Sequence, residues 1–130
     1  HFPQKMVIYP DAYGNSARTN TSSSQTDHSL LRAAGLTLDC PSGNPPIKDR
    51  VQAMNHMFSD GTENRRYYVN TTKCPQYTQA LEQQVYDLNE MPSKNKKDNF
   101  DDLVDAAGYF IHRKFPIIRE RFTQQILRNY

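Results

Sequence analysis

Short apolar runs alternate along the chain with longer segments in which apolar residues recur every three or four positions. The short runs predict buried strands over residues 6–9, 36–40 and 66–70. The longer segments predict helices that begin after the capping box Ser24–Asp27, at Ile47, at Pro75, at Asp101 and at Ile117. Gly35 is expected to end the first of these helices. Strands that alternate with helices in this way are typical of an α/β fold with a parallel sheet.

One carboxylate follows directly after the first predicted strand. Asp11 comes after the run Met6–Tyr9 and Pro10, and in parallel sheets ligands bind beyond the carboxyl ends of the strands. Asp also favours tight turns, because its side chain accepts hydrogen bonds from nearby backbone. Position alone therefore leaves two roles for Asp11, a turn-forming residue or an acid held on a rigid edge for chemistry.

Composition bounds the class of protein without identifying its function. A chain of 130 residues forms a single domain, here with a terminal amphipathic helix predicted over residues 117–130. The net charge of +2 is no global sign of nucleic-acid binding. Cys40 and Cys74 lack the spacing of a zinc site and are expected to be reduced thiols. The sequence has no signal-peptide core and no long apolar stretch, so neither secretion nor membrane spanning is expected. Because it begins with His1, we expect it to be a piece of a longer protein.

A second group of acids lies in the segment "NFDDLVDAAGYFIH". On a helix, Asp101 and Asp102 share a face with Asp105, because they precede it by four and three residues. An acidic first turn interacts favourably with the helix dipole, which is one sufficient reason for these residues. The other is that they meet Asp11 around divalent cations, since carboxylate oxygens suit Mg²⁺ and Mn²⁺. Pairs of such ions support phosphodiester cleavage.

Five segments extend these two acidic motifs into an ordered series: "YPDAYGNSARTNTSSSQTDHSLLRAAG", "NPPIKDRVQAMNHMF", "RRYYVN", "LEQQVYD" and "DDLVDAAGYF". Over roughly residues 6–115, the series resembles the C-terminal nuclease domain of the large terminase subunit of tailed bacteriophages. The resemblance implies a ribonuclease H-like fold. It also implies an endonuclease that cuts DNA concatemers with two Mg²⁺ or Mn²⁺ ions, while a separate ATPase domain drives packaging.

The resemblance also implies roles for the acids. Asp11 matches the second acidic motif of the family, and the third motif contains Asp101, Asp102 and Asp105, of which Asp102 matches best without excluding the others. The first acid of the family lies on a strand upstream of the Asp11 segment, and this sequence lacks that strand. We therefore expect a partial ribonuclease H-like sheet, an incomplete metal site, and sheet edges that favour self-association.

Basic side chains could contact DNA phosphates without reading the base sequence. The predicted DNA contacts are Arg18, in the loop after Asp11, and Lys48, Arg50, Arg65 and Arg66; Lys73 and the lysines of segment 94–97 are further candidates. A solvated surface accounts equally well for each of them singly. His28 and His112 are expected to be ordinary histidines rather than metal ligands, although His112 follows Asp105 by seven residues on the acidic side of its helix.

The sequence thus predicts a metal-dependent DNA endonuclease domain from a phage or prophage packaging motor. Its catalytic residues would be Asp11, Asp102 and Asp105, with Asp101 as a further metal ligand. Its partners would be double-stranded DNA and, by the resemblance, the terminase ATPase domain, the small terminase subunit and the portal, in the cytoplasm of the bacterial host and with no membrane involved. The alternative is a non-catalytic interaction module that docks on a motor partner through the predicted helix 117–130.

Overall fold

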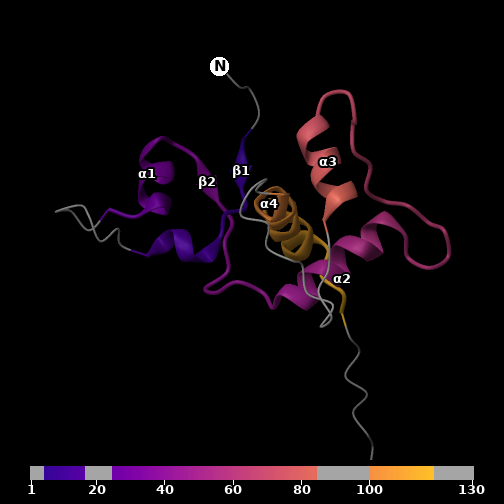
Figure 1. Ribbon diagram of the computed structural model, residues 1–130. Coiled ribbons are helices and arrows are strands. Elements are labelled where there is room, and N and C mark those ends of the chain that lie inside the picture. Colours follow the sequence, from indigo (N-terminus) through magenta and orange to yellow (C-terminus); the bar gives the residue numbers. More distant parts are fainter. Residues whose placement is uncertain (1–4, 17–24, 85–99, 119–130) are drawn as a thin grey trace, which may run out of the picture.

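A computed structural model describes residues 5–16, 25–84 and 100–118 of the chain. The elements in this part are β1 (Val7–Ile8), the 3₁₀-helix η1 (Ala12–Asn15), α1 (Asp27–Ala33), β2 (Thr37–Leu38), α2 (Ile47–Phe58), α3 (Pro75–Gln83) and α4 (Phe100–Lys114). Figure 1 shows the strands and α1 on one side of α4, and α3 on its other side. Helix α4 is therefore the element that joins the sheet side of the molecule to the other helices.

The two strands form a parallel pair. Val7 is opposite Thr37 and Ile8 is opposite Leu38, and the backbone N–H of Asp39 extends the ladder by donating to the carbonyl oxygen of Ile8 at 2.9 Å. Both strands run from the amino to the carboxyl end in the same direction, so Asp11 and Asp39 follow them at the same edge of the sheet. The predicted parallel arrangement is confirmed for these two strands, each of which is shorter than the sequence predicted.

Helix α1 connects the two strands, and its N-cap lies two residues after Ser24, where the predicted capping box begins. Its N-cap is Thr26, whose side-chain oxygen accepts from the backbone N–H of Ser29 at 3.1 Å, while Ser29 Oγ accepts from the N–H of Thr26 at 2.9 Å. This reciprocal pair satisfies two N–H groups of the helix end. The predicted Ser24–Asp27 box is therefore wrong, because Thr26 and Ser29 make it instead. Gly35 follows the end of the helix with φ of +83°, as predicted for a residue that must adopt the left-handed conformation.

The core lies among three helices. Helix α4 packs against both α2 and α3, and their contact buries side chains that recur at helical spacing: Ala53, Met54, Met57, Ala80, Val104 and Ile111. Pro75 occupies the first turn of α3, where its missing N–H costs no hydrogen bond. No helix among these residues is long and apolar enough to span a bilayer. The helices predicted from Ile47, Pro75 and Asp101 are thus confirmed in type and position.

The third predicted strand is wrong. Residues 66–70 form no strand, and the backbone N–H groups of Arg66 and Tyr67 both donate to the carbonyl oxygen of Met57 at 3.0 Å. The Tyr67 ring lies edge-to-face against Phe58, with ring centroids 5.2 Å apart. This aromatic segment therefore covers the end of α2 instead of adding to the sheet, since its backbone donors are used by a helix carbonyl.

Several predictions fall outside the described residues. These are the placement of Arg18, the lysines of segment 94–97, and most of the predicted terminal helix, of which residues 117 and 118 are seen and are not helical. The ribonuclease H-like fold is compatible with the mixed helices and short parallel sheet, although two strands alone do not define it.

Candidate functional site

Asp11 lies at the carboxyl end of β1 and caps η1. Its Oδ1 accepts hydrogen bonds from the backbone N–H of Tyr13 at 2.8 Å and from Asn44 Nδ2 at 2.7 Å. Its Oδ2 accepts from the hydroxyl of Tyr109 at 3.2 Å. The donors come from η1, from the segment before α2 and from α4, so three separate parts of the fold fix one carboxylate. Asp11 does form the turn, through the bond from Tyr13 to Oδ1. The bonds from Asn44 and Tyr109 are additional to that role.

These contacts keep Asp11 ionised. Partial burial acts to raise the pKa of its carboxyl. The three hydrogen bonds outweigh burial, and the positive charge of Arg50 adds to them, so the pKa of Asp11 lies below its ordinary value. A carboxylate at a strand end that remains charged at neutral and mildly acidic pH is suited to bind a cation or to accept hydrogen bonds from a ligand.

The backbone of Asp11 is fixed as firmly as its side chain. His28 of α1 is buried, and its Nε2 lies 2.8 Å from the carbonyl oxygen of Asp11. Since that carbonyl can only accept, Nε2 carries the proton in this contact. A Cβ on Gly14 would lie 2.9 Å from His28 Nε2, so a larger residue there would displace the imidazole from this contact. His28 is therefore a positioning group behind Asp11 and not a surface histidine.

Helix α4 presents Asp105 to a buried arginine. Arg50 Nη2 donates to Asp105 Oδ1 at 2.6 Å, and the Arg50 side chain is 4% exposed. The guanidinium carbon lies 4.6 Å from the centroid of the Tyr109 ring, one helical turn beyond Asp105. Because the Tyr109 hydroxyl reaches Asp11, the acids of β1 and α4 are joined through Arg50 and Tyr109.

Tyr109 acts as a hydrogen-bond donor in this arrangement. Burial raises the pKa of its hydroxyl, and the negative charge of Asp11 adds to the rise against the opposing effect of Arg50. The phenol therefore remains protonated and keeps donating to Asp11 throughout the neutral pH range.

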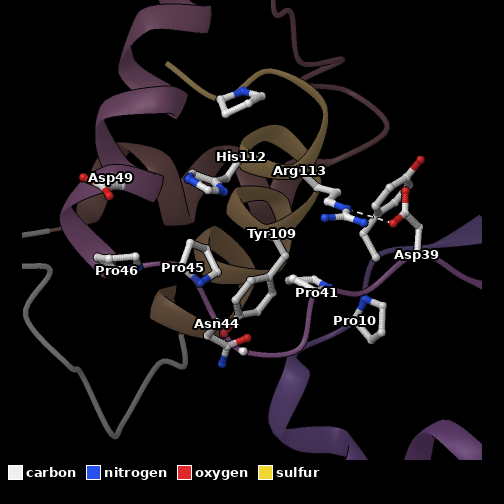
Figure 2. A pocket seen from close by; sticks show the side chains of 13 residues that line it. Pro10, Asp39, Pro41, Asn44, Pro45, Pro46, Asp49, Tyr109, His112 and Arg113 are labelled. Atoms are coloured by element: carbon white, nitrogen blue, oxygen red, sulfur yellow. Dashed lines mark hydrogen bonds and ion pairs between the residues drawn. The ribbon is translucent and has the colours of Figure 1, made fainter. Parts of the chain in front are cut away.

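A pocket of about 310 Å³ opens beside this network. Figure 2 shows Tyr109 and His112 of α4 facing Pro41, Asn44 and Pro45 of the segment between β2 and α2. The wall is rich in proline, which has no N–H to donate. Asn44 and Tyr109 line the pocket and also hold Asp11, so a ligand in the pocket would touch two of the three donors to that carboxylate.

A second arginine–carboxylate pair lies at the rim of the pocket. Arg113 Nε donates to Asp39 Oδ1 at 2.8 Å, and the two side chains are 43% and 31% exposed (Figure 2). Asp39 follows β2 as Asp11 follows β1, and the pair ties the end of α4 to the sheet edge. Solvent screens this pair far more than the Arg50–Asp105 pair.

Comparison with protein families decides the class of domain. A family model described as the terminase RNaseH-like domain matches residues 3–114. The chain belongs to this family. No curated protein and no solved structure matched the chain. The resemblance found in the sequence is confirmed, and the chain is a terminase RNaseH-like domain.

The described part of this terminase domain does not form a complete metal site. No group of three or more His, Cys, Asp or Glu side chains that could hold a metal comes together within residues 5–16, 25–84 and 100–118. Asp105 is paired with Arg50, whereas Asp102 is exposed on the first turn of α4, two turns before Tyr109 on the same helical face. Asp101 lies beside it and is half-buried. The carboxylates therefore follow one another along one side of the terminase domain, with Arg50 and Tyr109 between Asp105 and Asp11.

Within the part of the chain that the structure describes, the predicted DNA-contacting residues are not gathered at one edge. Arg65 and Arg66 are exposed, but they lie at the end of α2 that carries Met57, whereas Asn44 and Arg50 lie at its other end. Lys48 is exposed on the first turn of α2, near the candidate site. Arg50 is buried against α4, so its guanidinium contacts Asp105 in the structure. DNA contact by any of these residues remains a prediction.

Sequence reasoning missed the residues that hold Asp11. Asn44 and Tyr109 are 33 and 98 residues from it, and no local pattern connects them. Two signals were present: Asn44 precedes two prolines that restrict its backbone, and Tyr109 follows Asp105 by one helical turn.

Proposed function

We propose that this chain is the DNA-cleaving part of a phage or prophage packaging terminase, a metal-dependent endonuclease that cuts concatemeric DNA. The supporting observation is the Asp11 carboxylate, which three elements hold in place at the carboxyl end of β1. A turn-forming aspartate needs only the local bond to Tyr13. The long-range donors Asn44 and Tyr109 favour a role in which the position of the charge matters.

The cofactor in this proposal is Mg²⁺ or Mn²⁺, which prefer carboxylate oxygens. Asp11 would contribute from β1, and Asp102, with Asp101 and Asp105 near it, from α4. Because the described residues do not assemble a group of three ligands, a complete pair of ions would need ligands beyond them. The role of this chain's own residues is to hold charged carboxylates at a fixed edge.

The substrate in this proposal is double-stranded DNA, bound mainly through its phosphates. Arg18, Lys48, Arg65 and Arg66 would supply such contacts, which carry no sequence information. The partners would be the terminase ATPase domain, the small terminase subunit and the portal, in the cytoplasm of the bacterial host. A motor that moves DNA of any sequence is consistent with phosphate contacts of this kind.

The test is cleavage of supercoiled plasmid by the native full-length protein with Mn²⁺, Mg²⁺ or EDTA. We expect nicking with either metal and none with EDTA. Asp102→Asn should lower the rate at least about a hundredfold, since losing a metal ligand costs more than losing a residue that supports one. DNA affinity should stay within about twofold, because phosphate contacts dominate it.

Glu82→Gln is the matched control, because it removes an exposed acid from α3. Its cleavage rate should equal that of the unmodified protein. Nicking in EDTA, or absence of nicking with every divalent metal, would contradict the proposal and would favour an interaction module without catalysis.

A further inference from the structure

Arg50 is the most thoroughly enclosed charged residue in the described part of the chain. It is 3% exposed, and its guanidinium contacts Asp105 at 2.6 Å and the face of Tyr109 at 4.6 Å. A buried guanidinium needs a carboxylate partner, because an unpaired buried charge is strongly destabilising. The guanidinium group of arginine is a permanent cation in proteins. A permanent positive charge is therefore built into the acidic side of the molecule.

The packing fixes where that charge lies. Position 108 is glycine, and a Cβ there would come within 2.7 Å of Arg50 Cγ and Cδ and 3.1 Å of Met54 Sδ. The aliphatic part of Arg50 thus lies directly against the backbone of α4. This close approach places the guanidinium beside Asp105 and Tyr109, whose hydroxyl contacts Asp11 at 3.2 Å.

We infer that Arg50 is the resident cation of this carboxylate network, and that a divalent ion must compete with it for Asp105. The inference rests on the proposed metal-dependent function. It also explains a difference between the metal site that the resemblance implies and the structure. The acids lie along one side of the domain, yet no group of three metal-binding side chains forms in the described residues. Asp105, the acid of α4 nearest to Tyr109 along the helix, already has a cation.

A competing cation and a purely structural arginine predict opposite effects on metal binding. If Arg50 only supported the fold, removing its charge would loosen the carboxylates and weaken binding of a divalent ion. If Arg50 competes, removing its charge relieves the repulsion of the incoming ion and removes one cation that holds Asp105. Metal binding then becomes tighter even though the protein becomes less stable.

The experiment measures Mn²⁺ binding to the native full-length protein by electron paramagnetic resonance, which counts free Mn²⁺ without any cleavage assay. Arg50→Gln keeps an amide donor for Asp105 and removes the charge. It should lower the dissociation constant for Mn²⁺ by about tenfold, because two positive charges a few ångströms apart repel each other strongly in partly buried surroundings. Arg50→Met, whose unbranched side chain can still lie against Gly108, should act in the same direction.

Arg113→Gln is the matched control. It removes the same charge from an arginine–aspartate pair at the pocket rim, where the arginine is 43% exposed against 4% for Arg50. It should change the dissociation constant less than about twofold because solvent screens its charge. Thermal unfolding of each variant establishes that the protein titrated is folded.

Tighter Mn²⁺ binding by the Arg50 variants, with the Arg113 variant unchanged, supports the inference. Equal or weaker binding overturns it, as does absence of binding by both the unmodified protein and the folded Arg50 variants. Failure of the proposed nuclease function is seen separately, as lack of plasmid nicking despite normal Mn²⁺ binding.

Discussion

The Cγ and Cδ atoms of Arg50 lie 2.7 Å from the place where a Cβ of residue 108 would be. Real Cβ atoms do not approach other atoms so closely, so a side chain at this position must displace the buried Arg50 side chain or the helix that carries it. The glycine in "DAAGYF" therefore leaves room between α2 and α4 for the aliphatic part of the buried Arg50 side chain. The candidate site and the helical core share this contact.

Gly108→Ala should destabilise the protein by up to about 2 kcal/mol. Overpacking of a tight contact costs roughly 1–3 kcal/mol of unfolding free energy. Alanine offsets about 1 kcal/mol or less of this cost, because it favours the helix more than glycine does. Unfolding in urea measures the change. Gly43→Ala is the control, since Gly43 has ordinary φ and open space around it, and its stability should stay unchanged or rise slightly. A more stable Gly108→Ala variant would contradict the packing described here.

Tyr109→Phe should raise the pKa of the Asp11 carboxyl. The substitution removes the hydroxyl that donates to Oδ2 and keeps the ring that faces Arg50. In the folded protein the pKa of Asp11 is depressed, so its contribution to stability is present above the unfolded pKa and is lost as pH falls through the folded value. Carboxyl carbon shifts in an NMR titration would report the change. An unaltered Asp11 titration would mean that the Tyr109 contact does not stabilise the carboxylate.

Asp60 provides a pH effect away from the site. Hydrogen bonds from the hydroxyl and N–H of Thr62 lower its pKa to about 2, against an ordinary value of 3.8. Its stabilising contribution should be complete above the ordinary pKa and disappear as pH falls toward about 2. Thr62→Val removes only the hydroxyl and should move the pKa of Asp60 upward in an NMR titration. Titration of Asp60 near 3.8 in the unmodified protein would contradict this turn geometry.

Glu63→Gly should increase stability by about 0.5–1 kcal/mol. Glu63 is the one residue other than glycine with positive φ in the described part of the chain, at 62°. The left-handed conformation costs a side-chain-bearing residue roughly 1–2 kcal/mol, and the greater freedom of glycine in the unfolded chain offsets part of the gain. Glu63→Ala is the control for loss of the charge, and its urea unfolding midpoint should match that of the unmodified protein. Equal midpoints for both variants would argue against strain at this position.

The sequence predicted elements well where the pattern is local. The periodic apolar residues of α2 and α4 and the Pro75 start of α3 are each signalled within a few residues. The prediction of a strand over residues 66–70 was wrong because aromatic and β-branched residues suit any half-buried extended segment. Tyr67 covers α2 through contacts with Phe58 and with the carbonyl of Met57, and composition cannot distinguish this from pairing in a sheet.

In the candidate site, too, the sequence predicted the residues with local signals and missed those that depend on tertiary contacts. Asp11 could be singled out because strand ends and turn chemistry are visible in a short window. Its partners could not, because Asn44 and Tyr109 meet it only after β2, α2 and α4 have packed. The acids of α4 were recognised as a group, but their separate roles depend on Arg50, whose burial against Gly108 is a property of the folded chain.

The most direct test of the account compares two aspartates at the same edge of the sheet. Asp11 follows β1 and Asp39 follows β2, and both are held by hydrogen bonds from other elements. Single-turnover cleavage of plasmid DNA by the native full-length protein with Mn²⁺ should be lost in Asp11→Asn, while Asp39→Asn should cleave within about threefold of the unmodified protein, because its exposed pair with Arg113 contributes little. Both variants should bind DNA normally. Unimpaired cleavage by Asp11→Asn would contradict the account and would leave Asp11 as the residue that ends β1 and caps η1.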